Sequence, residues 1–219
     1  MRGLRIIYCL VLSLFLPFGN LAAAGWTAGS GLTSSQDFSA FETIERRLGL
    51  STAKIPHDRK CLSEEMRVFF NEEMDREAEI YLQALNKDSA YHPSGWMDWQ
   101  VGAVKPYVSV VLLETMVYEG GAHPLSYVKG ITLDAAGKVM TLSDLQAAMP
   151  SLSLEMIRNA AVRECVARDI STESAERIEE FPKEFYIGND GHLYFIFQQY
   201  DIASYSEGWI MADMGRFPF

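Results

Sequence analysis

The chain has 219 residues, of which 48% are hydrophobic and 22% charged, and its formal net charge is -10 at pH 7. This composition is that of a globular protein, and it excludes a collagen-like repeat, a disulfide-dense mini-protein and a long disordered acidic tail. The 29 acidic residues outnumber the 19 basic ones, which is the wrong sign for covering a phosphate backbone. Nucleic acid is therefore not an expected partner.

Residues 1–24 have the layout of a secretory signal peptide. Two arginines precede an apolar run at residues 6–16, a Pro-Phe-Gly-Asn break follows, and Ala22-Ala23-Ala24 matches a small-residue cleavage site. The alternative, a membrane anchor, needs about 20 continuous apolar residues, and this run is shorter. We expect cleavage after Ala24 and a secreted or periplasmic product without a membrane span.

The next segment predicts a small helical lobe. Residues 25–37 are small and polar, which is typical of a flexible leader. Residues 63–85 repeat apolar side chains at three- and four-residue steps, which predicts a helix whose opposite, acidic face, including Glu77, is solvated. Residues 86–100 contain a His-Pro-Ser-Gly segment and indicate a loop. The predicted helical lobe spans residues 38–100.

Strands dominate the beginning of the second half, residues 101–219. Residues 107–118 are rich in β-branched and aromatic side chains, which predicts a long strand. A glycine-rich turn leads to a second strand at residues 125–133, and a further turn leads to a third at residues 139–142. Three sequential strands of this kind predict an antiparallel meander.

Helices and a last hairpin follow. Residues 150–170 have helical periodicity, and residues 171–181 predict a short acidic helix. A hairpin is expected over residues 185–198, with an edge strand at residues 209–212. The predicted fold class is α+β: an antiparallel sheet of hairpins or a meander, packed by two or three helices.

The cysteines favour one disulfide. Cys9 leaves with the signal peptide, so the mature chain keeps Cys61 and Cys165, an even pair in an oxidising compartment. Two buried thiols are the alternative. The expected bridge ties the start of the first helix to the end of the second.

The chemical motifs in the sequence are weak. There is no G-x-S-x-G elbow, P-loop or dinucleotide fingerprint. Ser126 and Lys129 spell S-x-x-K, but positions three apart on a strand point to opposite faces, so we interpret the match as chance. The aromatic residues outside the periodic segments suggest a glycan- or protein-binding face, although core packing is their commoner role; they are Trp96, Trp99, Tyr200, Tyr205 and Trp209.

The histidines do not indicate a metal site. None of the four forms an H-E-x-x-H pair; they are His57, His92, His123 and His192. His123 and His192 both fall at predicted turns, where with Glu119 and Asp190 they could assemble a site at one end of the sheet. The favoured interpretation is that they are turn-forming polar residues, and neither a metal nor a cofactor is predicted.

Two blocks of sequence resemble a known family. The first is Tyr118-Glu119-Gly120-Gly121-Ala122-His123-Pro124, followed by Ile131-Thr132-Leu133-Asp134, and the second is Phe195-Ile196-Phe197 with Tyr200, Tyr205 and Gly208. In order and spacing these blocks resemble the domain at the carboxyl end of the anti-sigma factor RsiV, which also accompanies the peptidoglycan deacetylase PdaC.

The resemblance implies an extracytoplasmic domain that binds lysozyme or another cell-wall-related protein or glycan. The candidate binding or structural residues that it implies are Tyr118, Glu119, Gly120, Gly121, His123, Pro124, Tyr200, Tyr205 and Gly208. The expected function is non-catalytic recognition of such a partner. An enzyme that acts on peptidoglycan fragments, with His123 as general base or metal ligand near Glu119, is the alternative.

Overall fold

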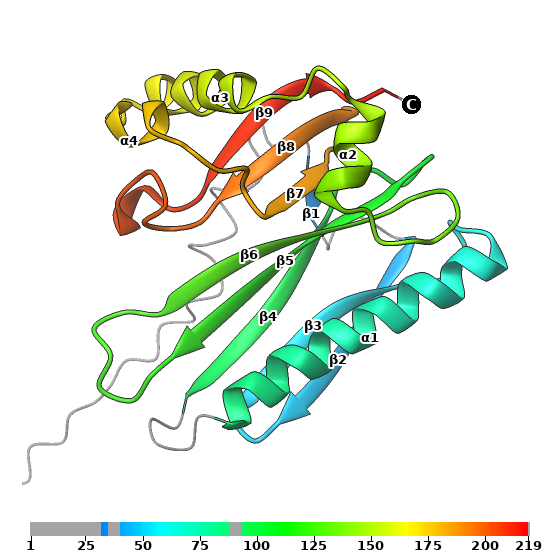
Figure 1. Ribbon diagram of the computed structural model, residues 1–219. Helices are drawn as coiled ribbons and strands as arrows, with labels where there is room; N and C mark the ends of the chain where they lie inside the picture. The colour runs from blue at the N-terminus through cyan, green and yellow to red at the C-terminus, as the bar shows by residue number, and fades with distance from the viewer. Residues whose placement is uncertain (1–31, 35–39, 88–92, 219) are drawn as a thin grey trace, which may run out of the picture.

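The computed structural model describes residues 32–34, 40–87 and 93–218, and it confirms the α+β class (Figure 1). The predicted signal peptide, most of the predicted leader and His92 lie outside these residues. Two open sheets and four α-helices make up the described part. No helix in the described ranges combines the length and the apolarity that crossing a membrane requires.

The large sheet has the strand order β2-β3-β4-β5-β6, with the short β1 also paired to β4. Its strands are β1 (Thr33–Ser34), β2 (Phe41–Leu48), β3 (Ser51–Asp58), β4 (Ser94–Val101), β5 (Val108–Val117) and β6 (Leu125–Leu133). All neighbours are antiparallel except β3 and β4. A parallel pair needs a crossover, and the helix α1 (Glu64–Lys87) supplies it.

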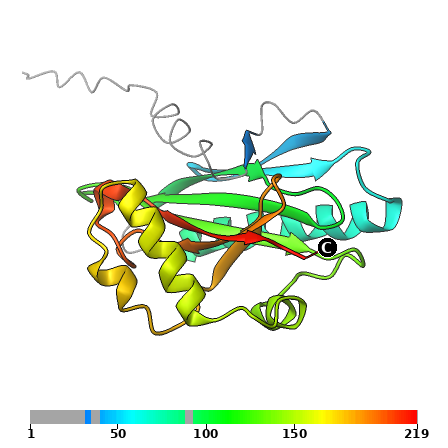
Figure 2. The same ribbon diagram turned by 90° about the horizontal axis from the view of Figure 1, so that it is seen from above.

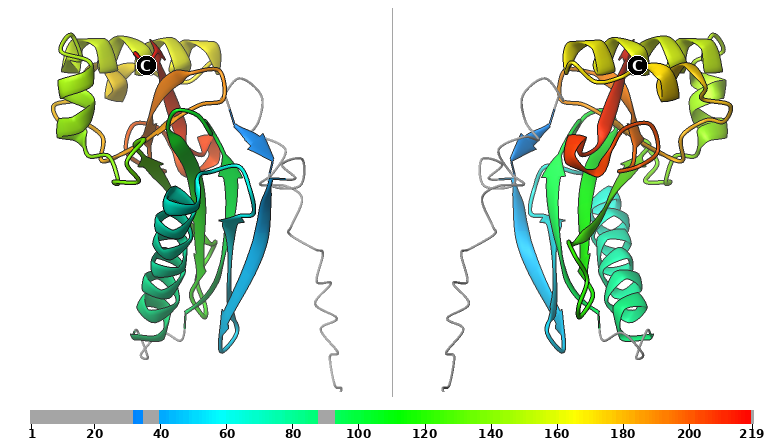
Figure 3. Two further views of the ribbon diagram at one scale, coloured as in Figure 1. Left: turned by 90° about the vertical axis from the view of Figure 1, so that its right-hand side faces the viewer. Right: turned by 90° about the vertical axis from the view of Figure 1, so that its left-hand side faces the viewer.

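The small sheet has the order β7-β8-β9, from β7 (Glu184–Ile187), β8 (His192–Phe197) and β9 (Ile210–Arg216). Between the two sheets in sequence lie the helices α2 (Leu142–Ala148), α3 (Leu154–Ala167) and α4 (Glu173–Glu176). The molecule is layered as α1, large sheet, small sheet and α3 (Figures 1 and 3). Seen from the side of α3, this helix lies across the small sheet (Figure 2).

Three apolar clusters separate the layers. The cluster between α1 and the large sheet includes Phe70, Met74 and Trp99. A second cluster lies between the sheets, and a third, around Ile157 and Phe195, fills the space between α3 and the small sheet. Alternate residues of β5 serve the first two clusters, because successive side chains on a strand point to opposite faces. This strand is therefore apolar on both faces.

Two glycines let the sheets approach each other closely. A Cβ atom on Gly130 of β6 would lie 1.9 Å from the carbonyl oxygen of Phe185 in β7, and one on Gly102 would lie 2.2 Å from the oxygen of Ile187. Ala103 donates a backbone hydrogen bond of 2.8 Å to the same Ile187 oxygen. Backbone contact at this distance joins the large sheet to the small one, and no side chain larger than hydrogen fits there.

Most elements predicted from periodicity are confirmed. The helix expected at residues 63–85, the strands at 107–118 and 125–133, and the helix at 150–170 correspond to α1, β5, β6 and α3. The last hairpin is β7 and β8, and the expected edge strand is the longer β9.

The prediction of a helical lobe at residues 38–100 misses three strands. β2 and β3 form a hairpin, and β4 occupies most of the segment predicted to be a loop. The residues Pro93-Ser94-Gly95 are typical of a loop, which is why a loop was expected there. Gly95 lies within β4, where only glycine fits, because a Cβ there would be 2.2 Å from the Thr115 carbonyl oxygen and 2.4 Å from the Tyr81 hydroxyl. Since β4 pairs with β5 over eight residues, the large sheet continues across the expected boundary at residue 100.

Three shorter segments also differ from their predictions. Residues 33–34 of the expected leader pair with β4 as β1, and Leu32 is buried between the sheets. The third meander strand is reduced to one bridge between Leu133 and Val139, because Thr141 and Asp144 form a capping box that starts α2. The acidic helix expected at residues 171–181 is the four-residue α4.

The expected disulfide is wrong in this structure, where both cysteines are free. Cys165 on α3 is fully buried in the cluster against the small sheet, whereas Cys61 precedes α1 on the far side of the large sheet. Disulfide geometry needs Cα atoms within about 7 Å, and two sheet layers intervene here. Burial raises the pKa of both thiols.

Candidate functional site

His123, Tyr200 and Tyr205, from two loops far apart in sequence, form a contiguous group of rings that we call the aromatic surface. The ring centroids of His123 and Tyr205 are 4.0 Å apart, and those of Tyr200 and Tyr205 are 6.0 Å apart. His123 belongs to the loop between β5 and β6, and Tyr205 begins the 3-10 helix η3 (Tyr205–Glu207) between β8 and β9. Both loops lie at the left-hand end of the molecule in Figure 1.

The carbonyl oxygen of Pro124 joins the two loops. It accepts a hydrogen bond of 3.0 Å from the Tyr205 hydroxyl, and it lies 3.0 Å from Nδ1 of His123. A carbonyl oxygen only accepts, so Nδ1 of His123 carries the hydrogen in this contact. The two bonds fix the orientation of both rings.

The position of Tyr200 follows from a tight turn after β8. Its backbone has a φ of 73°, and its amide donates to the carbonyl of Ala203. The Asp201 carboxylate accepts a hydrogen bond of 2.7 Å from the amide of Gln198. The Gln198 side chain also pairs with both backbone groups of Val128 on β6, at 2.9 and 2.8 Å. This turn is therefore fastened to the large sheet, and its tyrosine projects outward with 61% of its surface exposed.

The charge around the aromatic surface has one sign. The loops at residues 118–124 and 198–209 contain no lysine or arginine. Their acidic residues, Glu119, Asp201 and Glu207, are all exposed. The face therefore combines exposed π-systems with carboxylates, a combination suited to cationic groups.

The other predicted motif residues support these loops. Tyr118 and Gly121 form the turn after β5 through a hydrogen bond of 3.0 Å, while Gly120 has a φ of 77°. Gly208 has a φ of 73° at the end of η3, a conformation that favours glycine. Glu119 and His123 both lie in the described ranges, and no hydrogen bond or ion pair joins them.

The remaining histidines lie apart from the aromatic surface. His192 is at the start of β8 with Nδ1 3.0 Å from Asp213, whereas His123 packs beside η3, which follows the other end of that strand. His57 lies 3.3 Å from Asp75. In the described ranges no three His, Cys, Asp or Glu side chains are arranged to hold a metal ion.

The remaining residues singled out in the sequence also lie outside the aromatic surface. Lys129 bonds to α1, while Ser126 lies 3.2 Å from the hydroxyl of Thr115, so the S-x-x-K match does not form a pair. Trp99 is core, with 2% exposed, and Trp209 packs against the cluster between the sheets. Trp96 is 41% exposed on β4.

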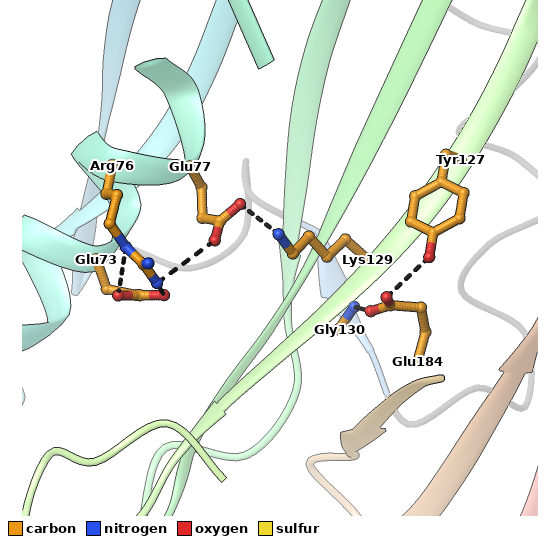
Figure 4. Close-up of polar contacts among 7 residues, drawn as sticks. All are labelled: Glu73, Arg76, Glu77, Tyr127, Lys129, Gly130 and Glu184. Atoms are coloured by element: carbon orange, nitrogen blue, oxygen red, sulfur yellow. Dashed lines mark hydrogen bonds and ion pairs between the residues drawn. The ribbon is translucent and has the colours of Figure 1, made fainter. Parts of the chain in front are cut away.

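Sequence reasoning missed a second group, the charged cluster, made of Glu77, Glu114, Tyr127, Lys129 and Glu184. Lys129 donates a hydrogen bond of 2.5 Å to Glu77, a residue that is only 4% exposed and so is not on the solvated face predicted for it. Glu184 of β7 accepts from the Tyr127 hydroxyl at 2.8 Å and from the Gly130 amide at 3.0 Å (Figure 4). The cluster thereby joins α1, β6 and β7.

Glu114 is the carboxylate of this cluster that has the fewest partners. It lies on β5 directly opposite Tyr127, and in the described residues no group donates a hydrogen bond to its side chain. Burial raises its pKa to about 7, with further repulsion from Glu77 and Glu184 and partial relief from Lys129. A lone acidic residue within an apolar strand was the one signal of this site in the sequence.

Comparisons with known proteins agree with this architecture. The family model described as "Protein of unknown function (DUF3298)" matches residues 144–214. A DUF3298 family protein from Pseudomonas aeruginosa PAO1 shares 14% identity at a TM-score of 0.58, over 80% of this chain and 89% of its own. A member of the same family from Bacteroides fragilis NCTC 9343 shares 12% identity at a TM-score of 0.52, over 79% and 88%.

No curated protein matches the chain. The sequence match takes in β7, β8, most of β9 and the tyrosines of the aromatic surface, and it begins after the turn that carries His123. The chain is therefore similar in sequence to the DUF3298 family of unknown function over its last third, and similar in fold to solved members of that family over about four-fifths of its length.

Proposed function

We propose that this protein is an extracytoplasmic, non-catalytic recognition domain whose aromatic surface binds a basic protein, with a lysozyme-type muramidase as the partner. The observation that carries the proposal is the contact between His123 and Tyr205 beside the exposed Tyr200. Two remote loops are held together there, and the result is an outward-facing group of rings.

The chemistry of the surface favours a cationic partner. Tyrosine faces attract lysine and arginine side chains, and each such contact contributes about 0.5–1 kcal/mol at an exposed site. Exposed carboxylates at Glu119 and Glu207 add charge complementarity, which speeds encounter more than it tightens the complex. The formal net charge of -10 acts in the same direction at long range.

The rigidity of the surface supports binding. The Tyr205 ring is already fixed by Pro124, and the Tyr200 turn is fixed by Asp201. The Tyr205 ring and the backbone of the Tyr200 turn are therefore ordered before a partner docks, which reduces the entropy lost on binding. The contacts of His123 also suit a structural role, since Nδ1 donates to a backbone carbonyl and no hydrogen bond or ion pair joins Glu119 to the ring in the described residues.

The choice of lysozyme rests on the resemblance of both loops to the domain of RsiV. Its motif residues are the ones that meet here: His123 and Pro124 from one block, Tyr200 and Tyr205 from the other. The localisation rests on residues 1–24, which have the layout of a cleavable signal peptide.

The test is a binding titration of residues 25–219 with lysozyme, comparing the native sequence with Tyr200→Ala. Loss of an exposed aromatic anchor is expected to weaken binding at least tenfold while leaving the melting temperature unchanged. Trp96→Ala, at an exposed aromatic residue on β4 and away from the aromatic surface, is the matched control and is expected to bind as the native protein does. Equal weakening by both variants, or by neither, would exclude the aromatic surface as the binding face.

A further inference from the structure

The charged cluster contains more carboxylates than cations can neutralise. Three carboxylates, Glu77, Glu114 and Glu184, lie together with one ammonium group, that of Lys129. Arg76 is 3.8 Å from Glu77, but it is committed to Glu73, its neighbour on α1. Glu114 and Glu184 are half-buried, so an excess negative charge here is only partly hydrated, and hydrogen bonds or a bound proton stabilise the cluster.

Two of the three carboxylates have donors. Glu77 receives the Lys129 ammonium, and Glu184 receives both the Tyr127 hydroxyl and the Gly130 amide. Both therefore have what an ionised carboxylate requires. Glu114 has no donor in the described residues, and it lies on the strand between them.

Three elements, α1, β6 and β7, carry titratable side chains that interact with Glu114. These side chains are Glu77 and Tyr81 of α1, Tyr127 and Lys129 of β6, and Glu184 of β7. On β4 the residue opposite Glu114 is Met97, which does not titrate. Only Lys129 favours the ionised form of Glu114.

We propose that Glu114 is the proton-binding side chain of the charged cluster, and that its proton holds α1 and β7 on the large sheet as a pH-sensitive latch. With the proton bound, the cluster carries two carboxylates and one ammonium, and α1 and β7 meet an uncharged group on β5. Without it, a third negative charge faces Glu77 and Glu184. The inference does not depend on the proposed binding function, because none of these side chains belongs to the aromatic surface.

The direction of the pH effect follows from linkage. The ordinary pKa of a glutamate, 4.5, is raised to about 7 in the folded state. Between these values the folded protein binds the proton more tightly than the unfolded chain does. The contribution of Glu114 to stability is therefore complete below pH 4.5, and it is lost as the pH rises toward and through 7.

The experiment measures urea unfolding midpoints of residues 25–219 between pH 5 and pH 8 for the native sequence and for Glu114→Gln, an isostere of the protonated form. Relative to the variant, the native midpoint is expected to fall between pH 5 and about pH 7 and to level off above it. Glu119→Gln, at an exposed glutamate beyond the same strand, is the control and is expected to follow the native curve. Parallel curves for native and Glu114→Gln would overturn the proposal.

A second measurement uses the native protein alone, so it stands even where a variant fails to fold. Carboxyl carbon NMR of Glu114 is expected to titrate with a midpoint near 7. Amide exchange in α1, corrected for its intrinsic pH dependence, is expected to accelerate at least tenfold between pH 5 and pH 8. A midpoint near 4.5, or exchange that does not change in α1, would contradict the latch.

Discussion

The hydroxyl of Tyr205 donates a hydrogen bond of 3.0 Å to the carbonyl of Pro124, a residue 81 positions earlier in the chain. This bond joins the loop after β5 to the loop after β8, and it holds the Tyr205 ring under His123. This bond is therefore one of the contacts that hold the aromatic surface together, beside the ring contact of His123 and the bonds of Gln198 to β6.

Tyr205→Phe tests that contact. Removing the donor while keeping the ring is expected to lower the free energy of unfolding by about 1 kcal/mol and to weaken partner binding by loosening the two loops. Urea unfolding and a binding titration measure both effects. Tyr200→Phe is the control, because its hydroxyl forms no hydrogen bond with the described residues. Equal losses in the two variants would show that the bond to Pro124 does not fix the surface.

The pair Glu77 and Lys129 gives a prediction about buried charge. Lys129→Met leaves the Glu77 carboxylate buried without its nearest cation, and the free energy of unfolding is expected to fall by roughly 3 kcal/mol. The double variant Glu77→Leu with Lys129→Met removes both charges and is expected to recover most of that loss. Denaturant unfolding of the two single variants and of the double variant measures this double-mutant cycle. If the losses of the two single variants add up in the double variant, the two side chains are not coupled.

Gly130 tests the close approach of the two sheets. Gly130→Ala places a methyl group 1.9 Å from the Phe185 oxygen, so a loss of about 3 kcal/mol or failure to fold is expected. In Gly120→Ala the added Cβ would meet no other part of the protein within 4 Å. The expected loss of stability is therefore only the cost of a φ of 77° in a residue with a side chain, about 1–2 kcal/mol. Thermal unfolding of both variants makes the comparison. A smaller loss at Gly130 than at Gly120 would contradict the close approach.

The thiols are expected to be free in the purified protein. In denatured protein without reductant, a thiol assay is expected to detect two free thiols per mature chain. Addition of reductant is expected to leave the melting temperature unchanged. In the native state Cys61 reacts and Cys165 does not, because the latter is fully buried. Two missing thiols in the denatured sample would show a bridge.

The sequence predicted the elements whose apolar pattern is strong. The helical periodicity of α1 and the β-branched residues of β5 indicate a helix and a strand from the local sequence alone. The β2–β3 hairpin was missed because seven of the eight side chains of β2 are at least partly exposed, so no alternation marks it. β4 was missed because Gly95 signals a turn, whereas its role is to admit the Tyr81 hydroxyl.

The candidate sites were only partly predictable from the sequence. The motif blocks around His123 and Tyr205 were identifiable as separate segments, but the hydrogen bond that joins them spans 81 residues and depends on how the two sheets pack. The charged cluster draws on α1, β5, β6 and β7, and Glu77 lies within an acidic run that ordinarily indicates a solvated face. Only tertiary packing distinguishes this glutamate from its neighbours.

The most direct measurement is isothermal calorimetry of residues 25–219 with lysozyme at low and at moderate salt. Saturable binding that weakens as salt rises is expected, because exposed carboxylates beside Tyr200 attract the basic partner and salt screens them. Absence of binding heat at both salt concentrations, with no complex detected in a parallel sedimentation experiment, would contradict the proposed function.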